Sequence, residues 1–131
     1  MSYRVCLAAC DLYIPADKAL LALAKAIALR GYPGCEGLAD VLAAEGFDPE
    51  PLPGGGIRVQ GLADDELFDE PSADRLLHAI SREVADGSFL VLVDEDYAVW
   101  RNYFDGGEYV RDCSDWLTRG LGPVIEGADA A

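Results

Sequence analysis

The residues in this sequence that could do chemistry are acidic side chains gathered in three short runs. The runs cover residues 64–66, 69–70 and 94–96. Neighbouring carboxylates can bind Mg²⁺ or Ca²⁺ or act as general acids and bases, but the Asp-x-Asp-x-Asp-Gly spacing of a calcium loop is absent. Nothing singles out two of the 24 acids as a glycosidase pair. We therefore predict neither a metal site nor a cofactor.

The cysteines and the single histidine offer little for catalysis. Three residues separate Cys6 from Cys10, a spacing that zinc knuckles use. In a strand this spacing spans ~13 Å, which is too far for one ion or a disulfide. We expect Cys6 and Cys10 on one face of a buried strand, and all four cysteines, including Cys35 and Cys113, as reduced thiols of the cytoplasm. No catalytic triad can be argued for His78 from spacing, so it is expected to pack or to lie at the surface.

The elements that must position these side chains begin with a strand over 3–13, apolar on both faces and therefore central. A helix is expected from Pro15 until Gly31. Its inward stripe is predicted to be Leu20, Leu23, Ala24, Ile27 and Ala28. A short helix over 36–45 should bury Leu38, Val41 and Leu42. A third helix should follow the acids at 64–72 and continue through 87, burying Leu76, Leu77, Ile80 and Val84.

The remaining segments predict a sheet. Residues 46–56 carry prolines at alternate positions and are expected to be irregular, and 57–60 should form a half-exposed strand. The last third is expected to be a β-meander of strands 89–93, 97–104 and 108–113. Together these elements predict one two-layer α+β domain over 1–119, with a frayed tail over 120–131. Its sheet should have four or five antiparallel or mixed strands, with two or three helices on one face.

Aromatic residues concentrate in this meander. On a strand, Tyr97, Arg101 and Tyr103 share one face, whereas Trp100 and Phe104 share the other. The Trp100 face is the better candidate for the core, which leaves the Tyr97 face outward beside acidic turns. Tyrosine and arginine in such a place are typical interface anchors, although ordinary cross-strand packing explains them too.

Charge is distributed unevenly along the chain. The 131 residues carry a net charge of −14, which divides into +2 over residues 1–35 and −16 over 36–131. This charge argues against direct binding to nucleic-acid phosphates or to an anionic membrane. No apolar run approaches the ~20 residues of a spanning helix. A surface of one sign attracts a cationic partner, although solubility alone would also explain it.

A pattern in the later part of the chain resembles a known family. Its parts are Asp86-Gly87-Ser88-Phe89, Asp94-Glu95-Asp96, Trp100-Arg101 and Phe104-Asp105-Gly106-Gly107. This is similar to an uncharacterised family of small acidic proteins of actinobacteria and their mobile elements, in which a helix precedes a GSF or GSY strand, an acidic turn and a WRxxFDGG hairpin. The resemblance covers mainly 72–112, with weaker echoes in 36–60. It implies a fold pattern and no activity.

The leading functional hypothesis is a small cytoplasmic binding protein for a basic partner. An immunity protein, an antitoxin or a DNA-mimicking inhibitor of a nucleic-acid-binding enzyme would fit. The candidate partner-binding residues are Asp94, Glu95, Asp96, Tyr97, Arg101, Tyr103, Asp105 and Tyr109. The alternative is a small carboxylate- or metal-dependent enzyme that uses the Asp94–Asp96 turn. A third hypothesis is an accessory or oligomeric scaffold with a large apolar patch.

Overall fold

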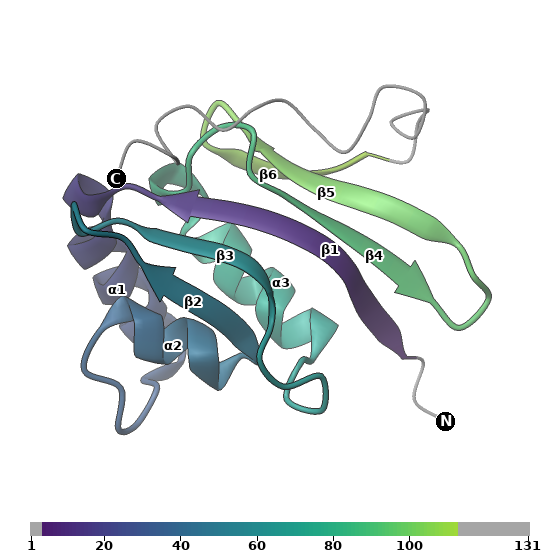
Figure 1. Ribbon diagram of the computed structural model, residues 1–131, viewed down its shortest axis with the longest axis horizontal. Coiled ribbons are helices and arrows are strands. Elements are labelled where there is room, and N and C mark those ends of the chain that lie inside the picture. The colour runs from purple at the N-terminus through teal and green to yellow at the C-terminus, as the bar shows by residue number, and fades with distance from the viewer. Residues whose placement is uncertain (1–3, 113–131) are drawn as a thin grey trace.

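A long central strand, β1 (Val5–Ile14), organises the fold in the computed structural model, which describes residues 4–112. Six antiparallel strands lie in the order β2-β3-β1-β4-β5-β6. Within the described residues, three α-helices cover one face of this sheet (Figure 1). The other elements are α1 (Ala16–Arg30), α2 (Leu38–Ala44), β2 (Phe47–Pro51), β3 (Ile57–Leu62), α3 (Glu70–Ala79), a 3₁₀ turn η1 (Ser81–Glu83), β4 (Phe89–Asp94), β5 (Val99–Asp105) and β6 (Glu108–Asp112). The predicted α+β class is confirmed, with one strand more than expected.

The prediction that β1 is central is confirmed, but the prediction for its two cysteines is wrong. β1 pairs with β3 on one side and β4 on the other. The pairing with β4 shifts between Leu7 and Ala9, and this bulge inverts the alternation of faces. Cys6 is therefore exposed on one face, whereas Cys10 is buried on the other, under the helices. Burial, helped by the Asp11 charge, raises the pKa of Cys10 to about 12, so this thiol is neutral and unreactive.

Helix α1 begins and ends where the sequence predicted, with Gly31 in the left-handed region at its C-terminal end. The predicted inward stripe is wrong except for Leu23, which packs against the core, because the helix buries the small side chains of Ala22 and Ala26. Leu20 is 79% exposed and Ile27 is 43% exposed. The helix is apolar on nearly every side, so periodicity alone could not choose its buried face. No helix in the part of the chain that the structure describes is long and apolar enough to span a membrane.

The proline-rich segment forms a strand, although the sequence predicted irregular structure there. β2 pairs with β3 through Pro49 opposite Val59 and Pro51 opposite Ile57. β2 lies at the edge of the sheet, where a proline that lacks an N–H need not break the ladder. The alternation predicted for β3 is confirmed, because Ile57 and Val59 are buried in the core.

The later elements follow the prediction closely. The third helix ends earlier than expected and continues as η1, but all four residues of its predicted stripe are buried. Strands β4, β5 and β6 form the predicted meander. The predictions for Cys113 and for the tail over 120–131 lie outside the described residues.

The residues of the GSF and WRxxFDGG pattern hold one another in place. The Asp86 carboxylate accepts a hydrogen bond from the backbone N–H of Gly106 (3.0 Å). The backbone N–H of Phe104 donates to the carbonyl of Ser88 (2.9 Å), and the backbone N–H of Tyr13 donates to Ser88 Oγ (3.1 Å). The pattern thus anchors the β5–β6 hairpin to the start of β4, and its contacts are structural.

Candidate functional site

The turn between β4 and β5 holds four of the predicted site residues. The Asp94 carboxylate closes it by accepting hydrogen bonds from the backbone N–H groups of Asp96 (2.9 Å) and Ala98 (3.0 Å). Tyr97 has a φ of 63°, a left-handed conformation that favours glycine or asparagine. Its side chain is 86% exposed, and Glu95 and Asp96 beside it are exposed as well. The turn therefore presents an aromatic ring together with carboxylates at the surface.

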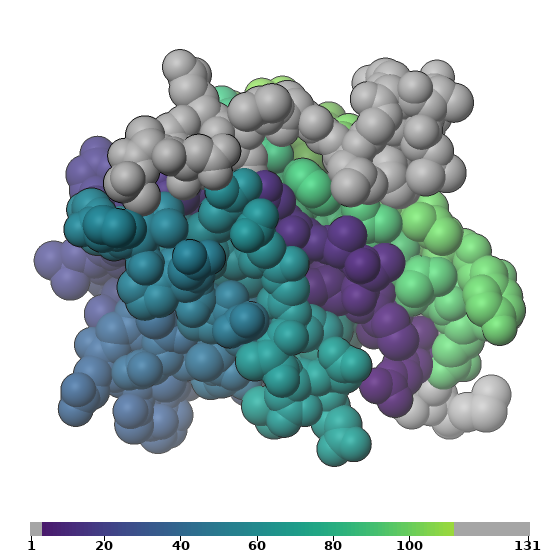
Figure 2. All heavy atoms as spheres, in the orientation of Figure 1, coloured from purple at the N-terminus to yellow at the C-terminus, as the bar shows by residue number. Residues whose placement is uncertain are grey.

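A second acidic segment lies on the other side of the start of β1. It consists of the loop that joins β3 to α3 and of Glu70, the first residue of α3. Arg4 lies between the two segments, because its backbone N–H donates to Glu95 Oε1 (2.9 Å) while it also lines a groove with Glu66 and Asp69. Figures 1 and 2 show the start of β1 between this loop and the β4–β5 turn. We call the carboxylates of the two segments the acidic end: Asp64, Asp65, Glu66, Asp69, Glu70, Asp94, Glu95 and Asp96.

The groove at the acidic end has a volume of about 620 Å³, within the range of ligand pockets. It is lined by the apolar side chains of Val5, Phe68 and Pro71 and by Arg4, Glu66, Asp69 and Glu70. Burial raises the pKa of the Glu70 carboxyl, and the charges of Asp74 and Asp69 raise it further, while Arg111 opposes them. The direction of this shift means that the negative charge of Glu70 is incompletely compensated.

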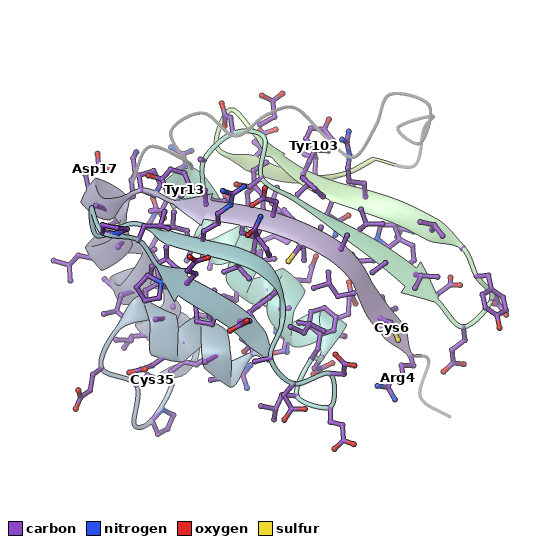
Figure 3. All side chains as sticks on the ribbon, viewed as in Figure 1. Arg4, Cys6, Tyr13, Asp17, Cys35 and Tyr103 are labelled. Carbon is purple, nitrogen blue, oxygen red and sulfur yellow. The ribbon has the colours of Figure 1, made fainter. Side chains whose placement is uncertain are left out.

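The structure separates Arg101 and Tyr103 from the turn. Trp100 and Phe104 face the core, as predicted, so Arg101 and Tyr103 lie on the face away from the helices. Arg101 is nevertheless only 7% exposed, and its guanidinium lies 5.0 Å from the centre of the Tyr103 ring. Tyr103 packs against Phe89 and the neighbouring apolar residues of that face. Arg4 and Tyr103 lie at opposite ends of the sheet (Figure 3).

The last two predicted residues also lie elsewhere. Asp105 is exposed in the β5–β6 hairpin, at the opposite end of β5 from the turn. Tyr109 points to the helix-covered side, where it is 6% exposed and stacks on Phe104 with 4.6 Å between ring centres. The Tyr109 hydroxyl accepts a hydrogen bond from Asn102 Nδ2 (3.0 Å). Of the eight predicted residues, the structure therefore brings together Asp94, Glu95, Asp96 and Tyr97.

The sequence did not predict that the residues of the β3–α3 loop would share a surface with the β4–β5 turn. The acidic runs themselves were visible, but nothing in their spacing showed that residues 64–70 and 94–96 would flank the same strand. The apolar members of the groove, Phe68 and Pro71, carried a weak signal because they interrupt an acidic segment. Their proximity depends on the order of strands in the sheet, which a single sequence does not specify.

Comparison with models of known protein families, with curated proteins and with solved structures finds no match. The family resemblance of the hairpin therefore stays a prediction. Among residues 4–112, no group of three or more His, Cys, Asp and Glu side chains is arranged to hold a metal ion.

Proposed function

We propose that the protein binds a basic protein partner and that the acidic end is its contact surface. The observation that supports this is a groove at the start of β1 that Glu66, Asp69 and Glu70 line, while Glu95 of the third acidic run accepts a hydrogen bond from the backbone N–H of Arg4, which also lines the groove. The partner in this proposal is a nucleic-acid-binding enzyme, whose basic surface an inhibitor, antitoxin or immunity protein would cover. A cytoplasmic site of action fits the free thiols of Cys6, Cys10 and Cys35.

The groove has the chemistry that a lysine or arginine side chain requires. Such a side chain has an apolar stem and a charged head, and the two need different surroundings. Val5, Phe68 and Pro71 offer apolar contact for the stem, and Glu66 and Asp69 offer carboxylates for the head. A cation at this position would also offset the burial and the neighbouring negative charges that raise the pKa of Glu70.

Tyr97 gives independent support for a binding role at the turn. A left-handed conformation costs a residue other than glycine roughly 1–2 kcal/mol, and an exposed tyrosine recovers little of this through packing. Strain at an exposed position is typical of residues that serve binding. Exposed Leu67, in the loop on the other side of β1, adds a second apolar contact at the acidic end.

The proposal is tested by affinity capture from a lysate of the native host at low ionic strength. The bait is the full chain in four forms: wild type, the double variant Glu66→Gln/Asp69→Asn, Tyr97→Gly, and the matched control Glu36→Gln/Asp48→Asn. The control removes the same charge from exposed positions outside the groove. We expect wild type and control to retain the same basic protein, and the double variant to lose it.

Tyr97→Gly separates binding from folding. We expect its thermal stability to rise, because glycine adopts the left-handed conformation without strain, while affinity for the captured partner falls by about tenfold or more. Isothermal titration with that partner and thermal unfolding measure the two effects. Equal retention by all four baits, or the absence of any basic protein from the wild-type eluate, would contradict the proposal.

A further inference from the structure

A second pocket lies between α3 and the strands β5 and β6. Its volume is about 340 Å³, and among its described residues it shares only Glu70 with the groove at the acidic end. Glu70, Asp74 and His78 follow one another at intervals of four residues, so they line one side of α3. Asn102, Tyr109 and Arg111 contribute to the opposite wall. The pocket thus places carboxylates opposite a buried amide and a phenol.

Asn102 is the least satisfied polar group of this pocket. The residue is 5% exposed, and its Nδ2 donates to the Tyr109 hydroxyl (3.0 Å). Its Oδ1 is buried and accepts no hydrogen bond from any residue in the described part of the chain. A buried acceptor without a donor is costly, and Asn102 forms part of the pocket wall. This wall therefore favours a ligand that brings N–H donors.

The charges around the pocket favour a cation. Glu70 and Asp74 supply two negative charges and Arg111 supplies one positive charge, while the Arg111 guanidinium lies over the Trp100 ring at 4.3 Å. Asp74 also accepts a loose contact from His78 Nε2 at 3.6 Å. Burial raises the pKa of the Tyr109 hydroxyl; the hydrogen bond with Asn102 opposes this rise, and the charges of Asp74 and Glu70 add to it. An anionic ligand would meet repulsion here.

We propose that this pocket binds an alkylguanidinium group. A guanidinium is a planar cation with five N–H donors in a fixed fork, so it can serve a carboxylate and an amide oxygen at the same time. Asp74 and Asn102 are the acceptors, and the rings of His78 and Tyr109, which meet edge to face with 5.0 Å between their centres, line the pocket beside them. The group belongs either to a free small molecule or to an arginine side chain of a protein.

The test is a titration of the Trp116→Phe variant, in which Trp100 is the remaining indole, with agmatine, putrescine and the peptide acetyl-Gly-Arg-Gly-amide. Tryptophan fluorescence and isothermal titration measure saturation. We expect agmatine or the peptide to bind at least about fivefold tighter than putrescine, because an ammonium lacks the planar fork. Tighter binding of agmatine identifies a free ligand, and tighter binding of the peptide identifies a protein side chain.

Variants on the same background connect this binding to the named acceptors. Asp74→Asn should weaken the affinity by about fivefold or more, whereas Glu108→Gln, exposed on the same strand as Tyr109, should leave it unchanged. Asn102→Leu should remove saturable binding, and thermal unfolding verifies that this variant is folded. The groove variant Glu66→Gln/Asp69→Asn should bind normally, which separates this site from the acidic end. Saturable binding of none of the three probes, tighter binding of putrescine, or equal weakening by Glu108→Gln would overturn the proposal.

Discussion

At the scale of single residues, a buried carboxylate needs several hydrogen-bond donors from the helical layer. Glu45 is 4% exposed, and its Oε1 accepts hydrogen bonds from Arg30 Nη1 (2.9 Å), the Tyr32 hydroxyl (2.9 Å) and Ser72 Oγ (3.0 Å). Arg30 Nη1 also donates to Ser72 Oγ. These partners come from the end of α1, the segment after it and the start of α3. One carboxylate oxygen therefore ties together three parts of the helical layer.

Glu45→Ala should lower the free energy of unfolding by about 3 kcal/mol, because it leaves a guanidinium and two hydroxyls without their shared acceptor. Urea denaturation measures this change, and the exposed Glu36→Ala serves as the control. Glu45→Gln keeps an acceptor oxygen and should cost less. If Glu45→Ala and Glu36→Ala unfold at the same urea concentration, the carboxylate does not hold the helices.

The hydrogen bond between Tyr32 and Glu45 leads to a prediction about how stability depends on pH. Burial, together with the hydrogen bond to Glu45 and its charge, raises the pKa of Tyr32 from 10.0 to about 12. Because the folded-state value lies above the unfolded one, the contribution of Tyr32 to stability is complete below pH 10 and is lost as the pH rises toward 12. Removing the Glu45 charge in Glu45→Gln should move this ionisation to lower pH, and a spectrophotometric phenolate titration against Tyr32→Phe measures the shift.

At the scale of the elements, the sequence predicted which segments form helices and strands, and in which order, better than it predicted which faces are buried and which strand lies at the edge of the sheet. Strand β1 and the meander were predictable because their apolar runs and turn residues are local signals. The face of α1 was not, because packing selected Ala22 and Ala26 over larger neighbours. The strand at Pro49 and Pro51 was missed because its stability comes from its partner and its edge position. Nothing in the sequence of β1 distinguishes the bulge from a regular alternation of side chains between the two faces of the sheet.

The β5–β6 hairpin depends on a contact with the turn before β4. Asp86→Ala removes the acceptor for the Gly106 backbone N–H and should cost about 1 kcal/mol. The loss should be local, so hydrogen exchange should accelerate at Gly106 and Gly107 while the amides paired between β1 and β3 keep their protection. Asp105→Ala removes the same charge from the neighbouring turn. Equal acceleration in that variant would attribute the effect to charge alone.

At the scale of the whole molecule, the fold concentrates a charge that the sequence distributes over separate runs. The division of the net charge of −14 into +2 and −16 predicted an acidic half of the chain. It did not predict that the β3–α3 loop and the β4–β5 turn would flank the same end of β1. This proximity follows from β1 lying between β3 and β4, a long-range arrangement that local patterns do not encode. The carboxylates of the candidate site were therefore predictable from the sequence, whereas the groove was not.

Concentrated charge should make the protein more stable in salt. Repulsion within the acidic end opposes folding, and salt screens it over a Debye length of about 10 Å at 0.1 M. Burial first, and then the charges of Asp74 and Asp69, raise the pKa of Glu70 above the ordinary value of 4.5. Its ionisation therefore costs stability as the pH rises, and the cost is complete above its folded-state pKa. Burial and these neighbouring charges together outweigh the favourable interaction of a first-turn carboxylate with the helix dipole.

Glu70→Gln should therefore melt at a higher temperature than wild type at neutral pH and low salt. The difference should shrink in part as sodium chloride is added, because salt screens the repulsion by Asp74 and Asp69 but leaves the cost of burying the charge. It should also shrink as the pH falls below 4.5, where the wild-type carboxyl is protonated in the folded and the unfolded state alike. Glu50→Gln, exposed on the edge strand β2, should give a smaller gain. A gain that persists unchanged in high salt would show that Glu70 destabilises the fold through burial rather than through the charge around it.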